Sequence, residues 1–144
     1  MIKLLAVGAI IVSSSALGMT LSSKLSKRAK QLAVLKKFAE EVKENIRYSS
    51  LRTDKLIESV ISKSEYDFLN DRDLFVNDED KKIYLEFLSG LGKTDTKGQM
   101  TYCDLWSVNF KNAAEKAQLE YSQKGKLYNI LGVCAGLAVS LIIV

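Results

Sequence analysis

The charged residues of this chain are confined to its middle, which narrows the possible folds more than any other feature of the sequence. Of the 21 Lys and Arg residues, one precedes residue 24 and none follows Lys126, and all 17 Asp and Glu residues lie between the same limits. Two uncharged, mainly apolar stretches remain, residues 4–23 and 127–144. A helix rises about 1.5 Å per residue, so about 18 residues span about 27 Å, close to the ~30 Å core of a bilayer. The sequence therefore predicts an all-α membrane helical hairpin, in which N- and C-terminal transmembrane helices flank a small helical bundle.

The flanking charges predict which side of the membrane the middle of the chain faces. Basic residues crowd just after the first apolar stretch and just before the second, and such residues stay in the cytoplasm. We therefore expect transmembrane helices at 1–23 and 127–144, a cytoplasmic helical domain at 24–126, and both termini on the opposite side. The basic residues are Lys24, Lys27, Arg28 and Lys30 at the first flank and Lys116, Lys124 and Lys126 at the second.

The first apolar stretch also resembles a signal peptide. Lys3 precedes a short apolar run, and Ser14, Ser15 and Ala16 offer small residues for cleavage. Cleavage there would produce a secreted or surface-tethered helical adaptor, held by its C-terminal tail. The sequence leaves this alternative open.

The residue types that carry most enzyme chemistry are scarce. The chain has no histidine, and Cys103 and Cys134 are too few for a four-thiolate zinc site. A phosphate-binding loop ending at Gly92 fails because Phe87 stands where glycine is required, and a loop from Asp71 lacks the calcium-site glycine. We therefore predict no enzymatic activity, catalytic residue, metal site or cofactor. The basic cluster lacks interleaved aromatic residues, so we expect it to contact membrane lipids and not nucleic acid.

Helical periodicity runs through the middle of the chain. An apolar seam at 3-4 spacing predicts one amphipathic helix over residues 24–49, continuous with the first apolar stretch. Three further helices are expected, the last running into the second apolar stretch with Gly125 as its weak point. The expected capping residues are Thr53, Asn77 and Thr96, with Gly92 ending the third helix. The expected core residues of the last helix include Cys103, Trp106 and Phe110.

Small residues in the second apolar stretch indicate close helix packing. Gly132 and Gly136 form a small-xxx-small pattern, which lets two helix backbones approach each other. The partner helix could belong to a second chain, giving a homo-oligomer. It could equally be the first apolar stretch of the same chain, through Gly8, Ala9 or Ser13.

The segment at residues 65–80 contains seven acidic residues and one arginine. One interpretation is a solvated connector between helices. The other is a docking surface for a basic partner, to which Asp71, Asp73 and Asp78 would contribute.

One short signature and the order of the segments resemble the stage III sporulation protein AB family. The signature is Leu-Gly-x-(Ser/Thr)-Asp-x-x-x-Gln, matched here by Leu91, Gly92, Thr94, Asp95 and Gln99. The MIKLL start, the basic helix RAKQLAVLKKFAEEV and the C-terminal span follow the same order. The resemblance covers nearly the whole chain.

This resemblance implies a non-enzymatic platform or scaffold of the mother cell–forespore channel in endospore formation, placed in the mother-cell membrane around the forespore. The family's soluble domain is similar to the cytoplasmic domains of type II secretion and type IV pilus platform proteins. The implied partners are the ATPase-like stage III sporulation protein AA and other products of the same operon. Asp95 and Gln99 would order a turn. Family members have a longer middle with more helix, whereas residues 62–78 here are short, polar and acidic. The full platform-like bundle, and any docking surface built from the part that is missing here, is therefore not carried over.

Overall fold

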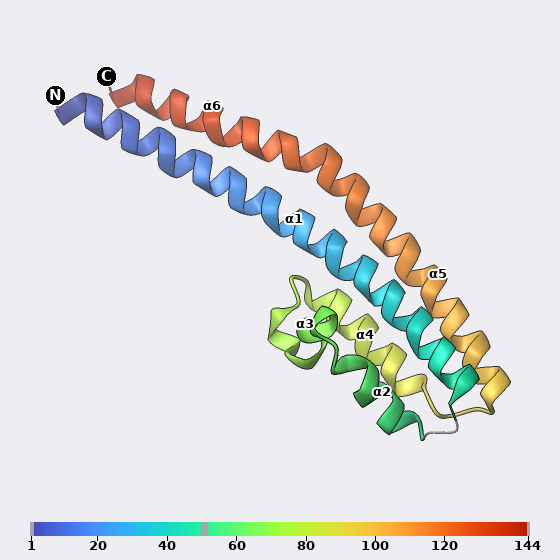
Figure 1. Ribbon diagram of the computed structural model, residues 1–144. Coiled ribbons are helices and arrows are strands. Elements are labelled where there is room, and N and C mark those ends of the chain that lie inside the picture. Colours follow the sequence, from blue (N-terminus) through green and yellow to red (C-terminus); the bar gives the residue numbers. More distant parts are fainter. Residues whose placement is uncertain (1, 50–51, 144) are drawn as a thin grey trace. The chain divides into compact units, whose positions relative to one another are not determined.

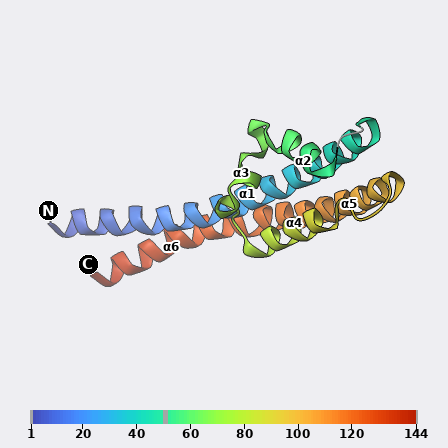
Figure 2. The same cartoon turned by 90° about the horizontal axis from the view of Figure 1, so that it is seen from below.

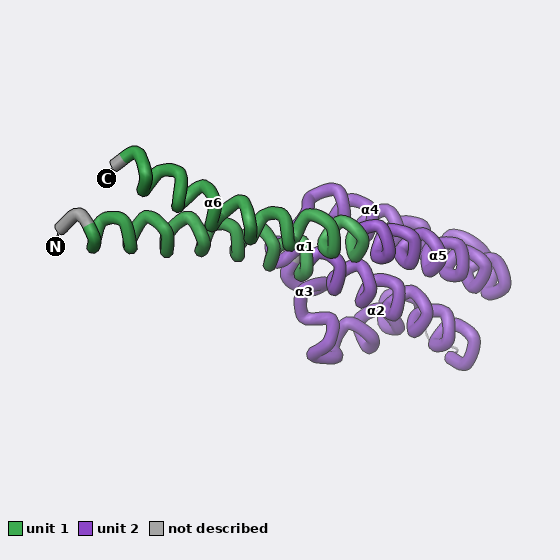
Figure 3. Tube along the Cα trace, turned by 90° about the horizontal axis from the view of Figure 1, so that it is seen from above, with its two compact units in different colours: residues 1–27, 117–144 green, residues 28–116 purple. Residues whose placement is uncertain are grey.

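In the computed structural model, which describes residues 2–49 and 52–143, every regular element is a helix (Figure 1). This confirms the all-α prediction. The chain divides into two compact units (Figure 3): unit 1 comprises residues 1–27 and 117–144, and unit 2 comprises residues 28–116. The elements are α1 (Ile2–Tyr48), α2 (Thr53–Ile61), η1 (Ser64–Tyr66), α3 (Asp67–Asn70), η2 (Arg72–Leu74), α4 (Asp78–Gly90), α5 (Thr96–Glu120), η3 (Tyr121–Gly125) and α6 (Lys126–Ile143).

Two helical stretches among the described residues are long and apolar enough to cross a membrane, judged by length and composition. They are Leu4–Tyr48 in α1 and Thr96–Ile142, which runs through α5 and α6. Each contains one of the uncharged ends of the sequence. The predicted arrangement, with apolar helices at both ends flanking a small helical region, is therefore confirmed.

Both long helices continue from one unit into the other along the chain. The uninterrupted course of α1 confirms that the amphipathic helix extends the first apolar stretch. The helix after Thr96 also reaches the C-terminal stretch, but it widens into the π-helical segment η3 over Tyr121–Gly125. Gly125, the expected weak point, is the last residue of that segment. The buried seam residues of α1 are Leu32, Leu35, Ala39, Val42 and Ile46.

Unit 2 is built around aromatic side chains from α1, α4 and α5. Phe38, Phe87 and Phe110 are fully buried, and the ring centroid of Phe87 lies 6.1 Å from that of Phe38 and 5.7 Å from that of Phe110. Trp106 packs against Phe87 and Phe110, with centroid separations of 5.8 and 5.5 Å. The assignment of Phe110 to the core is therefore confirmed, whereas Trp106 is half-buried and packs at the edge of this aromatic cluster. Burial of each such side chain contributes about 1.5–3 kcal/mol to stability.

The start of α4 is capped as predicted, whereas the start of α2 is not. Asn77 precedes α4, and its Oδ1 accepts a hydrogen bond from the backbone N–H of Glu79 at 2.8 Å. Thr53 is already the first residue of α2, so the prediction that it caps this helix is wrong. Arg52 holds the cap position and makes no side-chain cap bond. This helix therefore depends on its buried Leu56 and neighbouring apolar side chains more than on a cap.

Candidate functional site

The three predicted partner-binding residues of the 65–80 segment lie between the end of α3 and the first turn of α4. Asp71 accepts a hydrogen bond from the backbone N–H of Asp73 at 3.1 Å, which orders the turn into η2. Asp73 is 96% exposed, and its carboxylate lies 3.6 Å from the Lys81 ammonium. Asp78 is exposed in the first turn of α4. All three predicted partner-binding side chains thus face solvent within unit 2, where a basic partner could reach them.

A buried ion pair fixes this segment to α1. The Arg28 guanidinium donates hydrogen bonds to both carboxylate oxygens of Asp80, at 2.7 and 3.1 Å. The Asp80 side chain is 6% exposed and that of Arg28 is 26% exposed. Two parallel bonds of this kind fix geometry as well as adding energy. No sequence signal pointed to this pair, because its members are separated by 52 residues.

A second clamp holds the backbone of the same segment. The buried side-chain amide of Gln31 donates to the Leu74 carbonyl at 2.8 Å and accepts from the Val76 N–H at 3.0 Å. One side chain therefore supplies hydrogen bonds to two backbone groups of the loop, the Leu74 carbonyl and the Val76 N–H. The sequence gives no sign of this role, since both bonded groups are more than 40 residues from Gln31.

The segment is also tied down by apolar side chains. Tyr66 and Leu69 are buried, and Phe75 stacks on Tyr84 with ring centroids 5.7 Å apart. The Tyr66 hydroxyl donates to the Glu41 carboxylate at 2.6 Å, and burial followed by the nearby Glu65 raises the pKa of that phenol. The loop that carries Asp71 and Asp73 is therefore anchored on both sides to the core of unit 2.

The signature residues gather in the turn from α4 to α5. After α4 ends at Gly90, Leu91 is buried, and Gly92 has a φ of +80°, a conformation that favours glycine. Gln99 donates a side-chain hydrogen bond to the Thr94 carbonyl at 2.9 Å, closing the turn from its far side. Each polar contact of these residues serves the turn itself.

The cap of α5 differs from the expected one. The Asp95 carboxylate accepts from the Gly98 N–H at 3.0 Å, and its carbonyl accepts from the Gln99 N–H at 2.9 Å. Asp95 is therefore the capping residue, and the predicted capping box beginning at Thr96 is wrong by one position. The negative charge also suits the positive end of the helix dipole.

The buried thiol of Cys103 is unreactive. Cys103 is fully buried, and burial, with a smaller contribution from Asp104, raises the pKa of its thiol to about 11. A thiol reacts as the thiolate, so Cys103 is inert near neutral pH. Among the described residues, no three His, Cys, Asp or Glu side chains lie together where they could hold a metal ion.

The glycines of α6 lie against α1 within unit 1, where the two helices run antiparallel (Figures 1 and 2). A Cβ atom at Gly132 would come within 2.7 Å of the Ser14 carbonyl oxygen, and one at Gly18 within 2.5 Å of the Tyr128 carbonyl oxygen. The absence of side chains at these positions therefore permits the close approach of the two backbones.

The expected contact residues on α1 were wrong in detail. A Cβ at Gly136 would meet Ile11 and the Ser14 side chain, whereas one at Gly8 would meet no described atom within 4 Å. Ser13 is exposed and bonds only to the Ala9 carbonyl of its own helix. The residues of α1 that meet these glycines are therefore Ile11, Ser14 and Gly18, which are spaced by three and four residues along one helix face.

A comparison with protein-family models decides the family. The model for stage III sporulation protein AB matches residues 3–70 and 69–144, which together span nearly the whole chain. The chain belongs to the stage III sporulation protein AB family. No curated protein and no solved structure gives a significant match.

Membership of this family gives the chain a role in sporulation and confirms the resemblance inferred from the Leu91–Gln99 signature. The family is a structural one in sporulation and not a known enzyme family. The two matches overlap at residues 69–70, inside the acidic 65–80 segment.

Proposed function

We propose that this chain is a non-enzymatic membrane platform of the mother cell–forespore channel, on which an ATPase-like partner docks. Its place would be the mother-cell membrane around the forespore, with residues 24–126 in the cytoplasm. The named partner, stage III sporulation protein AA, comes from the family resemblance, as do the other products of the same operon.

The observation that carries the docking proposal is the presentation of exposed carboxylates on an anchored segment. Asp71, Asp73 and Asp78 project from a loop whose backbone is fixed by Gln31 and whose neighbour Asp80 is paired with Arg28. A charged surface that is already ordered loses little conformational entropy when a partner binds. It would also steer a basic partner toward this face.

Two features support insertion of both ends in a membrane. Both apolar helices expose large side chains along most of their length, as lipid-facing helices do; Leu4 and Leu141, for example, are 75% and 80% exposed. The packing of α6 against Ile11, Ser14 and Gly18 also gives the N-terminal stretch a role in the mature fold. Cleavage near Ala16 would remove part of that contact, so we favour retention over the signal-peptide alternative.

The docking proposal is tested by capturing the purified ATPase-like protein on the full chain in detergent. The test variant replaces Asp71, Asp73 and Asp78 with asparagine, because asparagine can still accept the turn and helix-start hydrogen bonds. We expect capture at low salt to fall about tenfold, and added salt to weaken the unmodified chain in the same way.

The matched control removes the same charge from elsewhere in unit 2. Glu44, Glu58 and Glu86 are exposed on α1, α2 and α4, and their replacement by glutamine should leave capture within about twofold. Equal losses in the two triple variants would show that only net charge matters. Undiminished capture by the test variant would refute docking at the acidic segment, and no capture by the well-folded unmodified chain would refute the platform proposal.

A further inference from the structure

Helix α5 exposes large apolar side chains on adjacent turns of its outer face. Leu105 is 59% exposed and Val108 is 53% exposed. Leu119, which is 61% exposed, follows Leu105 by two heptads and therefore lies on the same face of the helix. A single exposed leucine needs no explanation, whereas apolar side chains that recur along one helix face indicate a contact surface.

These side chains belong to a seam with heptad spacing, here called the α5 seam. Its steps alternate between four and three residues, the spacing that keeps one stripe of a helix against a partner helix in a coiled coil. The buried residues Cys103, Phe110 and Ala117 recur every seven residues on the opposite face of α5. All members of the seam are exposed, and they are Thr101, Leu105, Val108, Asn112, Glu115 and Leu119.

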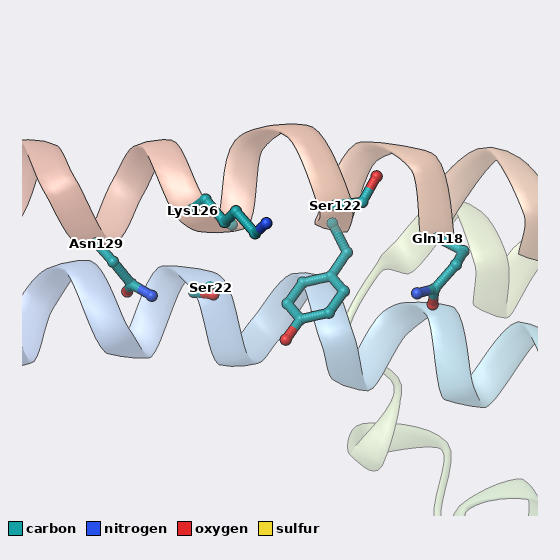
Figure 4. A pocket seen from close by; sticks show the side chains of 7 residues that line it. Ser22, Gln118, Ser122, Lys126 and Asn129 are labelled. Carbon is teal, nitrogen blue, oxygen red and sulfur yellow. The ribbon is translucent and has the colours of Figure 1, made fainter.

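The α5 seam becomes polar where α5 meets η3. Ser122 continues the spacing, and Figure 4 shows its side chain pointing away from α1, whereas that of Gln118 points toward α1. From Thr101 to Leu119 the seam covers about 27 Å of helix, at ~1.5 Å per residue. A contact this short is weak between free chains, but tethering both chains in one membrane raises their effective concentration.

The charges around the seam fit a second copy of the same chain. On one flank, Asp104 is already paired with Lys43 at 2.6 Å. Within the seam, Glu115 lies 3.9 Å from the Lys111 ammonium, and Lys116 pairs with no described carboxylate. In a parallel pair, Glu115 of one copy lies between its own Lys111 and Lys116 of the second copy. Each copy therefore supplies the carboxylate that offsets the repulsion between these lysines.

Membrane insertion determines the direction and register of such a pair. Two copies inserted in the same direction can be related by a two-fold axis along the membrane normal, which makes their α5 helices parallel and equally deep. Each seam residue then faces the same residue of the second copy. Asn112 would face its own counterpart, and a single asparagine in a coiled-coil seam specifies register and the number of strands at a cost in stability.

We propose that the α5 seam is an interface between two copies of this chain, arranged in parallel and in register. The homo-oligomer considered from the sequence would then form through α5 and not through Gly132 and Gly136, which meet α1 of the same chain. The inference rests on the membrane insertion proposed above. It is independent of docking at the acidic segment, which lies on other elements of unit 2.

The test is disulfide crosslinking of the full chain in isolated membranes, with Cys103 and Cys134 replaced by alanine. Asn112→Cys places two facing thiols in the seam, whereas Lys111→Cys places them on an exposed neighbouring position beside it. We expect at least about fivefold more covalent dimer from Asn112→Cys, because facing seam positions lie within disulfide reach. Equal crosslinking at the two positions, or no dimer, would overturn the interface. A covalent product with a different protein would assign the seam to that protein and also overturn it.

A second pair of variants tests the apolar contact in the Asn112→Cys background. Leu105→Glu with Val108→Glu should lower crosslinking at least about tenfold, because four carboxylates would meet in the seam. Ser59→Glu with Ser89→Glu adds the same charge at exposed positions of α2 and α4, and should change crosslinking less than about twofold. Circular dichroism checks that both variants remain folded. Unchanged crosslinking after the seam substitutions would overturn the proposal.

Two further measurements separate this proposal from the proposed function. Release of the chain from membranes by alkaline carbonate would refute membrane insertion and with it the parallel register. Capture of the ATPase-like protein by a chain that forms no crosslink at Asn112→Cys would refute the α5 interface alone. Crosslinking without capture would support the interface and refute only the docking proposal.

Discussion

The two units of this molecule use opposite packing rules. In unit 2, large aromatic side chains such as Phe38 and Phe87 are fully buried and charged residues cover the outside. In unit 1, glycines and serines lie between the helices, while large side chains such as Leu4 and Leu141 point outward. Water drives apolar groups inward, whereas lipid offers no such drive and leaves association to close backbone contact. The packing of unit 2 is therefore the kind expected in water, and that of unit 1 is the kind expected in lipid.

The largest expected effect comes from opening the aromatic core of unit 2. Phe87→Ala should lower the free energy of unfolding by about 3–5 kcal/mol, because Phe87 is fully buried among rings from two other helices, α1 and α5. The measurement is denaturant unfolding followed by Trp106 fluorescence. Leu105→Ala, at a 59% exposed position of α5, should cost less than about 0.5 kcal/mol. Similar losses in the two variants would mean that unit 2 lacks a specific core.

The next largest effect is expected from breaking the Arg28–Asp80 ion pair of unit 2, in comparison with an exposed ion pair of the same unit. Arg28→Met should destabilise the 71–77 loop by about 2–4 kcal/mol, because Asp80 is left buried without its bidentate partner. Lys37→Met breaks the exposed pair with Glu65 and should cost less than about 1 kcal/mol. Hydrogen exchange of the loop amides measures both. Unchanged protection in Arg28→Met would show that the Gln31 clamp suffices.

A smaller effect is expected from overfilling the helix contact of unit 1. Gly132→Val should cost about 1–3 kcal/mol, because its Cβ would come within 2.7 Å of the Ser14 carbonyl oxygen. Gly8→Val adds the same side chain where no described atom lies within 4 Å, and serves as the control. Pulsed EPR between labels at residues 5 and 141, in a cysteine-free background, should show a broadened distance distribution for Gly132→Val alone. Identical distributions would contradict packing through glycine.

The smallest effect concerns the signature turn. Asp95→Ala should lower the free energy of unfolding by about 1 kcal/mol, because the Gly98 N–H loses its acceptor. Asp95→Asn keeps the acceptor and should lose about half as much or less. Thr96→Ala, at the position once expected to begin the capping box, should be nearly neutral. If thermal unfolding shows that Thr96→Ala loses more stability than Asp95→Ala, Asp95 is not the capping residue of α5.

Patterns that repeat along a helix predicted the structure well, and single-residue features predicted it less well. The 3-4 seam from Leu32 to Ile46 correctly gave the buried face of α1, because burial of a helix follows its 3.6-residue period. The caps at Thr53 and Thr96 were wrong because several neighbouring residues could begin each helix. Which of these residues caps the helix depends on where the helix begins, and a sequence pattern fixes that position only to within one or two residues.

The candidate sites show the same division. The concentration of seven acidic residues in residues 65–80 could be read directly from the sequence. Which of them is buried could not, since Asp80 pairs with Arg28 whereas Asp73 faces solvent. The order of their loop could not, because it depends on Arg28 and Gln31, more than 40 residues away.

The sequence by itself determined the all-helical class, the two apolar ends, the charged middle and the family. Each of these depends on local composition or on a period along one helix, which solvent preference converts directly into structure. The tertiary structure alone decided that Ser14 and Gly18 meet α6 and that Asp80 is buried against Arg28. These features depend on which helix faces meet, and that choice follows from how side chains far apart in the sequence fill shared space.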